Sequence, residues 1–231
     1  MILAANFKMN HTRSSTKEYI NGLDLFLKDS KIRNDIYVFP PATALDSFDT
    51  NIKIGAQNGY PAINGSYTGE IGLEQLEELG IKTIIIGHSE RRHILGENQD
   101  FIIKKFNFFK AHDFTIFYCI GETLEVKEAG EELIKSYLKM QLDGIDLDYS
   151  NLIIAYEPVW AIGGKKSATT EDIKKRLEYI RTFSDAKLLY GGSVNLANIK
   201  EIISIPNCSG ALIGRASWEL DSFCKMIELT K

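Results

Sequence analysis

Short apolar runs, most of them rich in β-branched or aromatic side chains, recur along the whole chain. Most are nearly continuous rather than alternating, which is typical of strands buried on both faces of a parallel sheet. The runs have the length of strands and cover residues 2–5, 36–39, 52–56, 83–86, 115–119, 152–156, 187–190 and 211–213. The pattern therefore predicts eight strands.

Segments with helical periodicity lie between these runs. Ile173, Leu177 and Ile180 share one helical face, and Thr169 stands three residues before Asp172, as in a capping box. Similar patterns predict helices over residues 15–28, 73–79, 100–111, 131–141, 195–204 and 217–229. Between the second and third predicted strands, residues 42–51 leave room only for a short helix.

This alternation predicts an α/β fold in which eight strands and their helices form one closed (β/α)₈ barrel over residues 1–231. No Pro-, Gly- or Ser-rich linker and no low-complexity tract divides the chain, which favours a single domain. A doubly wound open sheet is the structural alternative. That fold usually has a glycine-rich turn after an early strand, and this sequence lacks one.

Composition narrows the class of protein. Of 231 residues, 44% are hydrophobic and 25% are charged, and the formal net charge is −4, which argues against a large nucleic-acid footprint. No window approaches the roughly 18 apolar residues of a membrane span, and the N-terminal residues do not have the order of a signal peptide. Cys119, Cys208 and Cys224 form neither a disulfide framework nor a zinc-ribbon pattern. We expect a soluble, cytoplasmic protein with reduced thiols and no metal.

Polar and glycine residues follow five of the predicted strands, in segments 6–10, 87–92, 157–165, 191–194 and 214–217. In a (β/α)₈ barrel the active site lies at the carboxyl ends of the strands, so catalytic groups are expected in these segments. Taken singly, Lys8 would be a surface charge, His88 a helix start and Glu157 a solvated loop residue. Their joint occurrence at strand ends favours a site.

These strand ends resemble the signature segments of the triosephosphate isomerase family. They read Asn-Phe-Lys-Met-Asn at 6–10, Gly-His-Ser-Glu-Arg-Arg at 87–92, Tyr-Glu-Pro-Val-Trp-Ala-Ile-Gly at 156–163 and Tyr-Gly-Gly-Ser-Val at 190–194. Tyr-Thr-Gly-Glu at 67–70 and Cys-Ile-Gly-Glu at 119–122 match further segments, in the family's order and at about its spacing. The resemblance implies the TIM barrel and a cofactor-free isomerase of glycolysis and gluconeogenesis. Such an enzyme interconverts dihydroxyacetone phosphate and D-glyceraldehyde 3-phosphate through an enediolate.

The resemblance also assigns roles to residues. The chemistry needs a base beside the carbon that loses its proton, and donors aimed at the developing oxyanion. By resemblance Glu157 is the base, His88 polarises the carbonyl, and Lys8 supplies positive charge against the enediolate and the phosphate. Asn6 assists in binding, and Glu90 supports the proton path. The phosphate is expected on backbone N–H groups of Gly163, Ser193, Gly214 and Arg215.

The sequence departs from the family's pattern at three places. Residues 163–166, at the far end of a segment that resembles the family's closing lid, read Gly-Gly-Lys-Lys instead of Gly-Thr-Gly-Lys. The last strand ends in Gly214-Arg215 where Gly-Gly is common, and the link from Thr169 to Tyr190 is shorter than usual. We expect the Arg215 side chain to point away from the phosphate and its backbone N–H to donate.

The resemblance further implies a two-fold symmetric homodimer. Residues 64–70 are expected to protrude into the neighbouring subunit, with Thr68 reaching towards the other active site near Asn6 and Lys8.

Other interpretations remain open. His11, His93 and His112 lack motif residues around them and are interpreted as structural or exposed. A different phosphosugar enzyme on the same barrel would share the phosphate loop but not the set of Lys8, His88 and Glu157. A non-catalytic scaffold would have lost at least one of those three.

Overall fold

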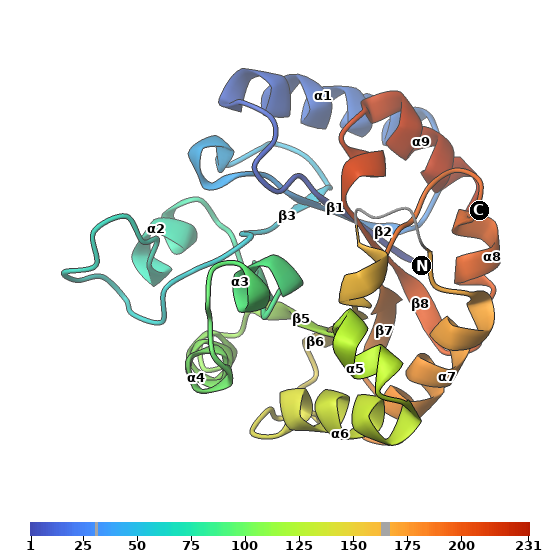
Figure 1. Cartoon of the computed structure of the whole chain (residues 1–231). Helices are drawn as coiled ribbons and strands as arrows, with labels where there is room; N and C mark the ends of the chain where they lie inside the picture. The colour runs from blue at the N-terminus through green and yellow to red at the C-terminus, as the bar shows by residue number, and fades with distance from the viewer. Residues whose placement is uncertain (31, 163–166) are drawn as a thin grey trace.

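The computed structural model describes residues 1–30, 32–162 and 167–231. Its eight strands are parallel neighbours in one sheet of order β3-β2-β1-β8-β7-β6-β5-β4 (Figure 1). The strands are β1 (Ile2–Asn6), β2 (Asp35–Phe39), β3 (Lys53–Ile54), β4 (Thr83–Ile86), β5 (Thr115–Ile120), β6 (Leu152–Tyr156), β7 (Lys187–Tyr190) and β8 (Cys208–Ile213).

The two end strands of this sheet are joined through Ala56. It forms a parallel bridge with Ile84: its N–H donates to the Thr83 oxygen at 2.8 Å, and its oxygen accepts from the Ile85 N–H at 2.9 Å. The sheet therefore closes into the expected (β/α)₈ barrel, and the open-sheet alternative is wrong. The third strand is shorter than the predicted run 52–56 because the chain stops pairing with β2 there and turns to β4.

Helices surround the strands (Figure 1). They are α1 (Arg13–Asp29), α2 (Leu73–Glu78), α3 (Ser89–His93), α4 (Gln99–Lys110), α5 (Leu124–Glu128), α6 (Glu131–Leu142), α7 (Thr170–Arg181), α8 (Ile199–Ile203) and α9 (Leu220–Glu228), with short 3-10 turns η1 (Ala42–Ala44), η2 (Val159–Ala161) and η3 (Arg215–Ser217). As expected, Thr169 Oγ1 caps α7 by accepting from the Asp172 N–H at 3.1 Å. No helix among the described residues is both long enough and apolar enough to cross a membrane.

Two predicted helices are shorter than expected. The run 195–204 is helical only at α8, because the Asn198 side chain accepts from the Asn195 N–H at 2.8 Å and so forms a local turn instead. The run 217–229 begins its helix at Leu220, since η3 occupies the preceding residues. Both changes lie next to polar loops that follow β7 and β8.

The hydrophobic core has two layers, as the continuous apolar runs require. Successive strand residues point to opposite faces, so Leu3 and Ala5 pack with the helices while Ile2 and Ala4 face the barrel interior. The interior cluster is drawn only from strands: Ile2, Ala4, Tyr37, Phe39, Ile85, Phe117, Cys119, Ile153, Ala155, Leu189 and Leu212. Asn6 continues the interior face of β1, which brings its side chain to the carboxyl end of the barrel.

Candidate active site

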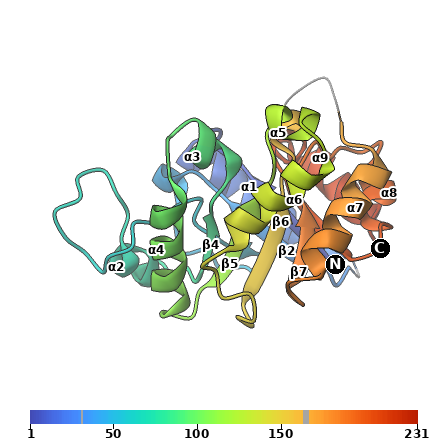
Figure 2. The same cartoon turned by 60° about the horizontal axis from the view of Figure 1, so that its bottom comes forward.

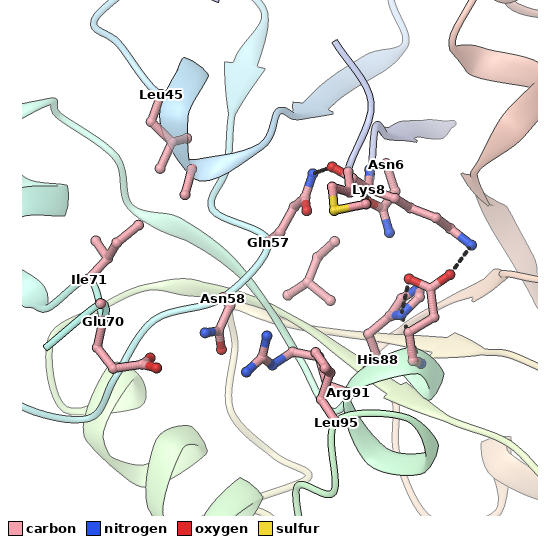
Figure 3. Close-up of a pocket in the computed structure, with 15 residues that line it drawn as sticks. Asn6, Lys8, Leu45, Gln57, Asn58, Glu70, Ile71, His88, Arg91 and Leu95 are labelled. Atoms are coloured by element: carbon pink, nitrogen blue, oxygen red, sulfur yellow. Dashed lines mark hydrogen bonds and ion pairs between the residues drawn. The ribbon is translucent and has the colours of Figure 1, made fainter. Parts of the chain in front are cut away.

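A cavity of about 550 Å³ opens at the carboxyl ends of the strands. It gathers most of the residues predicted for the site: Asn6, Lys8, His88, Glu90, Glu157, Ser193, Gly214 and Arg215. Gly163, which was also predicted to bind phosphate, lies outside the described residues, as does the far end of the segment resembling a lid. A second cavity of about 360 Å³ adjoins the first and shares Asn6, Lys8, His88 and Glu90 with it (Figure 3).

His88 and Glu157 lie side by side in the lining of the 550 Å³ cavity, although they follow β4 and β6. His88 Nε2 lies 3.2 Å from Glu157 Oε1, and the two side chains are 7% and 2% exposed. Glu157 Oε2 accepts from the Ser89 N–H at 2.9 Å, at the first residue of α3. The carboxylate is therefore shielded from water and held by a backbone donor at one oxygen, while the other oxygen faces the imidazole.

The backbone fixes the tautomer of His88. The Glu90 N–H donates to His88 Nδ1 at 3.2 Å, so this nitrogen acts as an acceptor and carries no proton. In the neutral ring the proton is then on Nε2, which points towards Glu157 and the cavity. A neutral imidazole with Nε2–H directed inward is arranged to donate a hydrogen bond to a substrate oxygen.

Lys8 brings a positive charge to the same cavity. Its Nζ lies 2.7 Å from Glu90 Oε1 (Figure 3). The Lys8 backbone has φ 51°, a left-handed conformation that is unfavourable for a residue with a side chain. Two hydrogen bonds hold it there: the Lys8 N–H donates to Asn6 Oδ1 at 3.0 Å, and Gln57 Nε2 donates to the Lys8 oxygen at 2.9 Å.

Glycines make room for these side chains. A Cβ at Gly191 would lie 2.7 Å from Cγ of Glu157, so any side chain there would displace the carboxylate. A Cβ at Gly214 would lie 3.2 Å from Cε of Lys8. The glycines at the ends of β7 and β8 thus allow the backbone to approach the charged groups closely.

The predicted phosphate side of the cavity is formed by the segments after β7 and β8. Ser193 Oγ donates to the Ala161 oxygen at 2.6 Å, which ties the first segment to η2. Arg215 is exposed, and its φ is not positive, so the residue that replaces the usual glycine causes no backbone strain. The arginine ion pairs of the described chain involve Arg13, Arg91, Arg176 and Arg181, so the Arg215 guanidinium has no acidic partner in that part of the structure.

Residues 119–122, which match a family segment, support the base from behind. Glu122 is buried and accepts from Tyr156 Oη at 3.0 Å and from Trp160 Nε1 at 2.9 Å. A Cβ at Gly121 would lie 1.8 Å from the Glu157 oxygen, so the glycine allows this strand end to cross close to the base. Burial raises the pKa of the neighbouring Cys119 thiol, which therefore stays protonated beside Glu157. The Cys-Ile-Gly-Glu pattern was the signal in the sequence from which these supporting residues could have been found.

Comparison with known proteins agrees with the geometry. The family model described as triosephosphate isomerase matches residues 1–230. The triosephosphate isomerase of a Nitratiruptor species is 59% identical over 231 residues, which cover 100% of this chain and 99% of the relative. Those of a Sulfurovum species and of Wolinella succinogenes are 56% and 54% identical over 98% and 99% of this chain and 99% of each relative. The chain therefore belongs to the triosephosphate isomerase family.

Proposed function

We propose that the protein interconverts dihydroxyacetone phosphate and D-glyceraldehyde 3-phosphate by proton transfer through an enediolate, in glycolysis and gluconeogenesis. One observation carries the proposal: Lys8, His88 and Glu157 come from three different strand ends and line one cavity, with 3.2 Å between His88 Nε2 and Glu157 Oε1. The chain's membership of the triosephosphate isomerase family, with matches to the family model and to relatives over nearly its whole length, supports the same activity.

In the proposed reaction Glu157 takes the proton from the carbon beside the carbonyl and returns it to the neighbouring carbon. His88 donates from Nε2 to the substrate oxygen on which negative charge develops, and this tautomer is supported by the bond from the Glu90 N–H to Nδ1. Lys8 stabilises the charge of the enediolate and of the phosphate, and Asn6 assists in binding. Glu90 supports the proton path through its contacts with both His88 and Lys8.

The phosphate is proposed to bind on the backbone N–H groups of Ser193, Gly214 and Arg215, together with Gly163. The first three line the same cavity as Lys8, and the close backbone approach at Gly214 supports an anion site there. Binding at one end of the substrate would then place its reactive carbons next to His88 and Glu157.

We further propose that the protein is a cytoplasmic, single-domain homodimer with no nucleic-acid or membrane partner. The loop that contains Thr68 is exposed and projects beside α2 (Figure 2). Exposed apolar side chains line the second cavity at Met9 and Leu95, with Met9 95% exposed, and belong to this loop at Ile63 and Tyr67. Ile94, which precedes Leu95 in the chain, is exposed as well. Apolar groups gathered on one face favour a protein partner, and Thr68 of a second copy would enter the cavity next to Asn6 and Lys8.

A coupled assay tests the function. The purified chain is supplied with D-glyceraldehyde 3-phosphate, and formation of dihydroxyacetone phosphate is followed through its reduction by an NADH-dependent enzyme. Turnover that is lost on Lys8→Ala would support the proposal. A folded, unaltered chain without turnover would contradict it and would favour a different phosphosugar enzyme or a scaffold.

A further inference from the structure

His11 has an unusual backbone for a residue with a side chain. Its φ is 72°, and it lies three residues after Lys8, whose φ is 51°. Two left-handed residues in so short a segment are unfavourable, and such conformations persist where surrounding contacts fix them. The contacts of His11 therefore bear on how Lys8 is held.

The His11 ring is bound on both sides. Nε2 lies 3.0 Å from the Trp218 backbone oxygen, and Nδ1 lies 3.2 Å from Ser15 Oγ. A carbonyl oxygen only accepts, so Nε2 carries a proton, and in the neutral ring Nδ1 accepts from the Ser15 hydroxyl. The ring also packs against Phe7, with 4.3 Å between ring centroids.

Trp218 holds the other end of the same segment. Its indole Nε1 donates to the Asn6 oxygen at 3.2 Å, while its backbone oxygen accepts from His11. It follows η3 and, like Lys8, lines the 550 Å³ cavity. The segment 6–11 is thus attached at both ends to one residue, which links the loop after β1 to the loop after β8.

We infer that His11 is a positioning residue: by bonding to Trp218 it fixes the Lys8 loop, and so the place of the Lys8 ammonium relative to the phosphate side of the cavity. The inference rests on the proposed function, which gives Lys8 its role. A change of His11 leaves the Lys8 ammonium chemically intact but frees the loop that carries it from Trp218. Loss of this clamp, the His11–Trp218 bond, should therefore weaken the binding of anions and lower turnover without unfolding the protein.

Three substitutions separate the clamp from simple packing. His11→Gln keeps an N–H donor near the place of Nε2. His11→Asn tolerates a left-handed backbone but is too short to reach Trp218, and His11→Gly relieves the backbone while removing both ring contacts. Asn207→Gly is the matched control, because Asn207 also has a positive φ, of 66°, but precedes β8 at the opposite end of the barrel.

The assay compares kcat, KM and the inhibition constant of inorganic phosphate in the isomerase reaction, together with the unfolding midpoint. We expect His11→Asn and His11→Gly to lower kcat/KM by about 10-fold or more and to raise KM and the phosphate inhibition constant, since small displacements of a binding group are costly. His11→Gln should stay within about threefold of the unaltered chain because it keeps the donor. All three His11 variants should remain folded at the assay temperature, and Asn207→Gly should change none of the kinetic constants.

Two results would overturn the inference alone: an active unaltered chain whose Asn and Gly variants keep its kcat and KM, or a Gln variant as impaired as the Asn variant. An unaltered chain without isomerase activity would instead contradict the proposed function, and the inference with it.

Discussion

The carboxylate of Glu157 is held between a backbone donor and an imidazole: Oε2 accepts from the Ser89 N–H at 2.9 Å, and Oε1 lies 3.2 Å from Nε2 of His88. Ser89 and Glu157 lie 68 residues apart in the chain, so the fold is what places the donor and the carboxylate together. Since His88 Nδ1 accepts from the Glu90 N–H, the neutral ring carries its proton on Nε2, on the side of the cavity. Backbone donors thus position both side chains at the carboxyl end of the barrel.

Arg215 provides a test of the phosphate side. Replacing it with glycine keeps the backbone N–H, so we expect Arg215→Gly to leave KM within a few-fold of the unaltered value. Folding stability should fall only by about 0.4–1 kcal/mol, because glycine increases the entropy of the unfolded chain. Steady-state kinetics and denaturant titration measure both effects. A KM raised tenfold or more in a folded variant would show that the guanidinium itself takes part in binding.

The proposed homodimer predicts a mass in light scattering twice the 26.0 kDa of one chain. Leu95→Asp should shift the protein towards monomers and reduce its activity, because it places a charge on an exposed apolar residue that lines the second cavity. Leu25→Asp is the matched control: Leu25 is 64% exposed but lies on α1, and this change should leave both mass and activity as they were. A fully active monomer of the unaltered chain would count decisively against the dimer.

A buried ion pair predicts how the fold responds to acid. Burial by itself raises the pKa of Glu97, but its hydrogen bonds with Arg91 and Lys105 outweigh that effect and keep the pKa below the ordinary 4.5. The stability that Glu97 contributes is then fully present above pH 4.5 and is lost as the pH falls through its lowered folded pKa.

Glu97→Gln should therefore lower the free energy of unfolding at neutral pH by about 3–5 kcal/mol, since it leaves the Lys105 charge buried without its partner. The difference in free energy of unfolding between the variant and the unaltered chain should become smaller below pH 4.5. Urea titrations at fixed protein concentration measure this difference in the free energy of unfolding. Glu178→Gln is the control, because the Glu178 side chain is half-exposed. An equal difference at every pH would exclude the ion pair as its cause.

Much of the fold could be predicted because the strands are buried on both faces and read as continuous apolar runs. The short β3 and α8 were missed for local reasons: the bridge of Ala56 to β4, and the competing Asn198 side chain, depend on tertiary or side-chain geometry. The motifs pointed to Lys8, His88 and Glu157, and the fold places these three residues in one cavity as expected. His11 was interpreted as structural or exposed because its partner, Trp218, is 207 residues away in sequence.

The proton transfer itself is tested most directly by the kcat of Glu157→Gln, measured beside that of the unaltered chain. The amide keeps the shape of the side chain but cannot take a proton. We expect kcat to fall by at least roughly 10²–10⁴ while KM changes little, because binding groups remain in place. A folded Glu157→Gln protein with a near-normal kcat would contradict the assignment of Glu157 as the base.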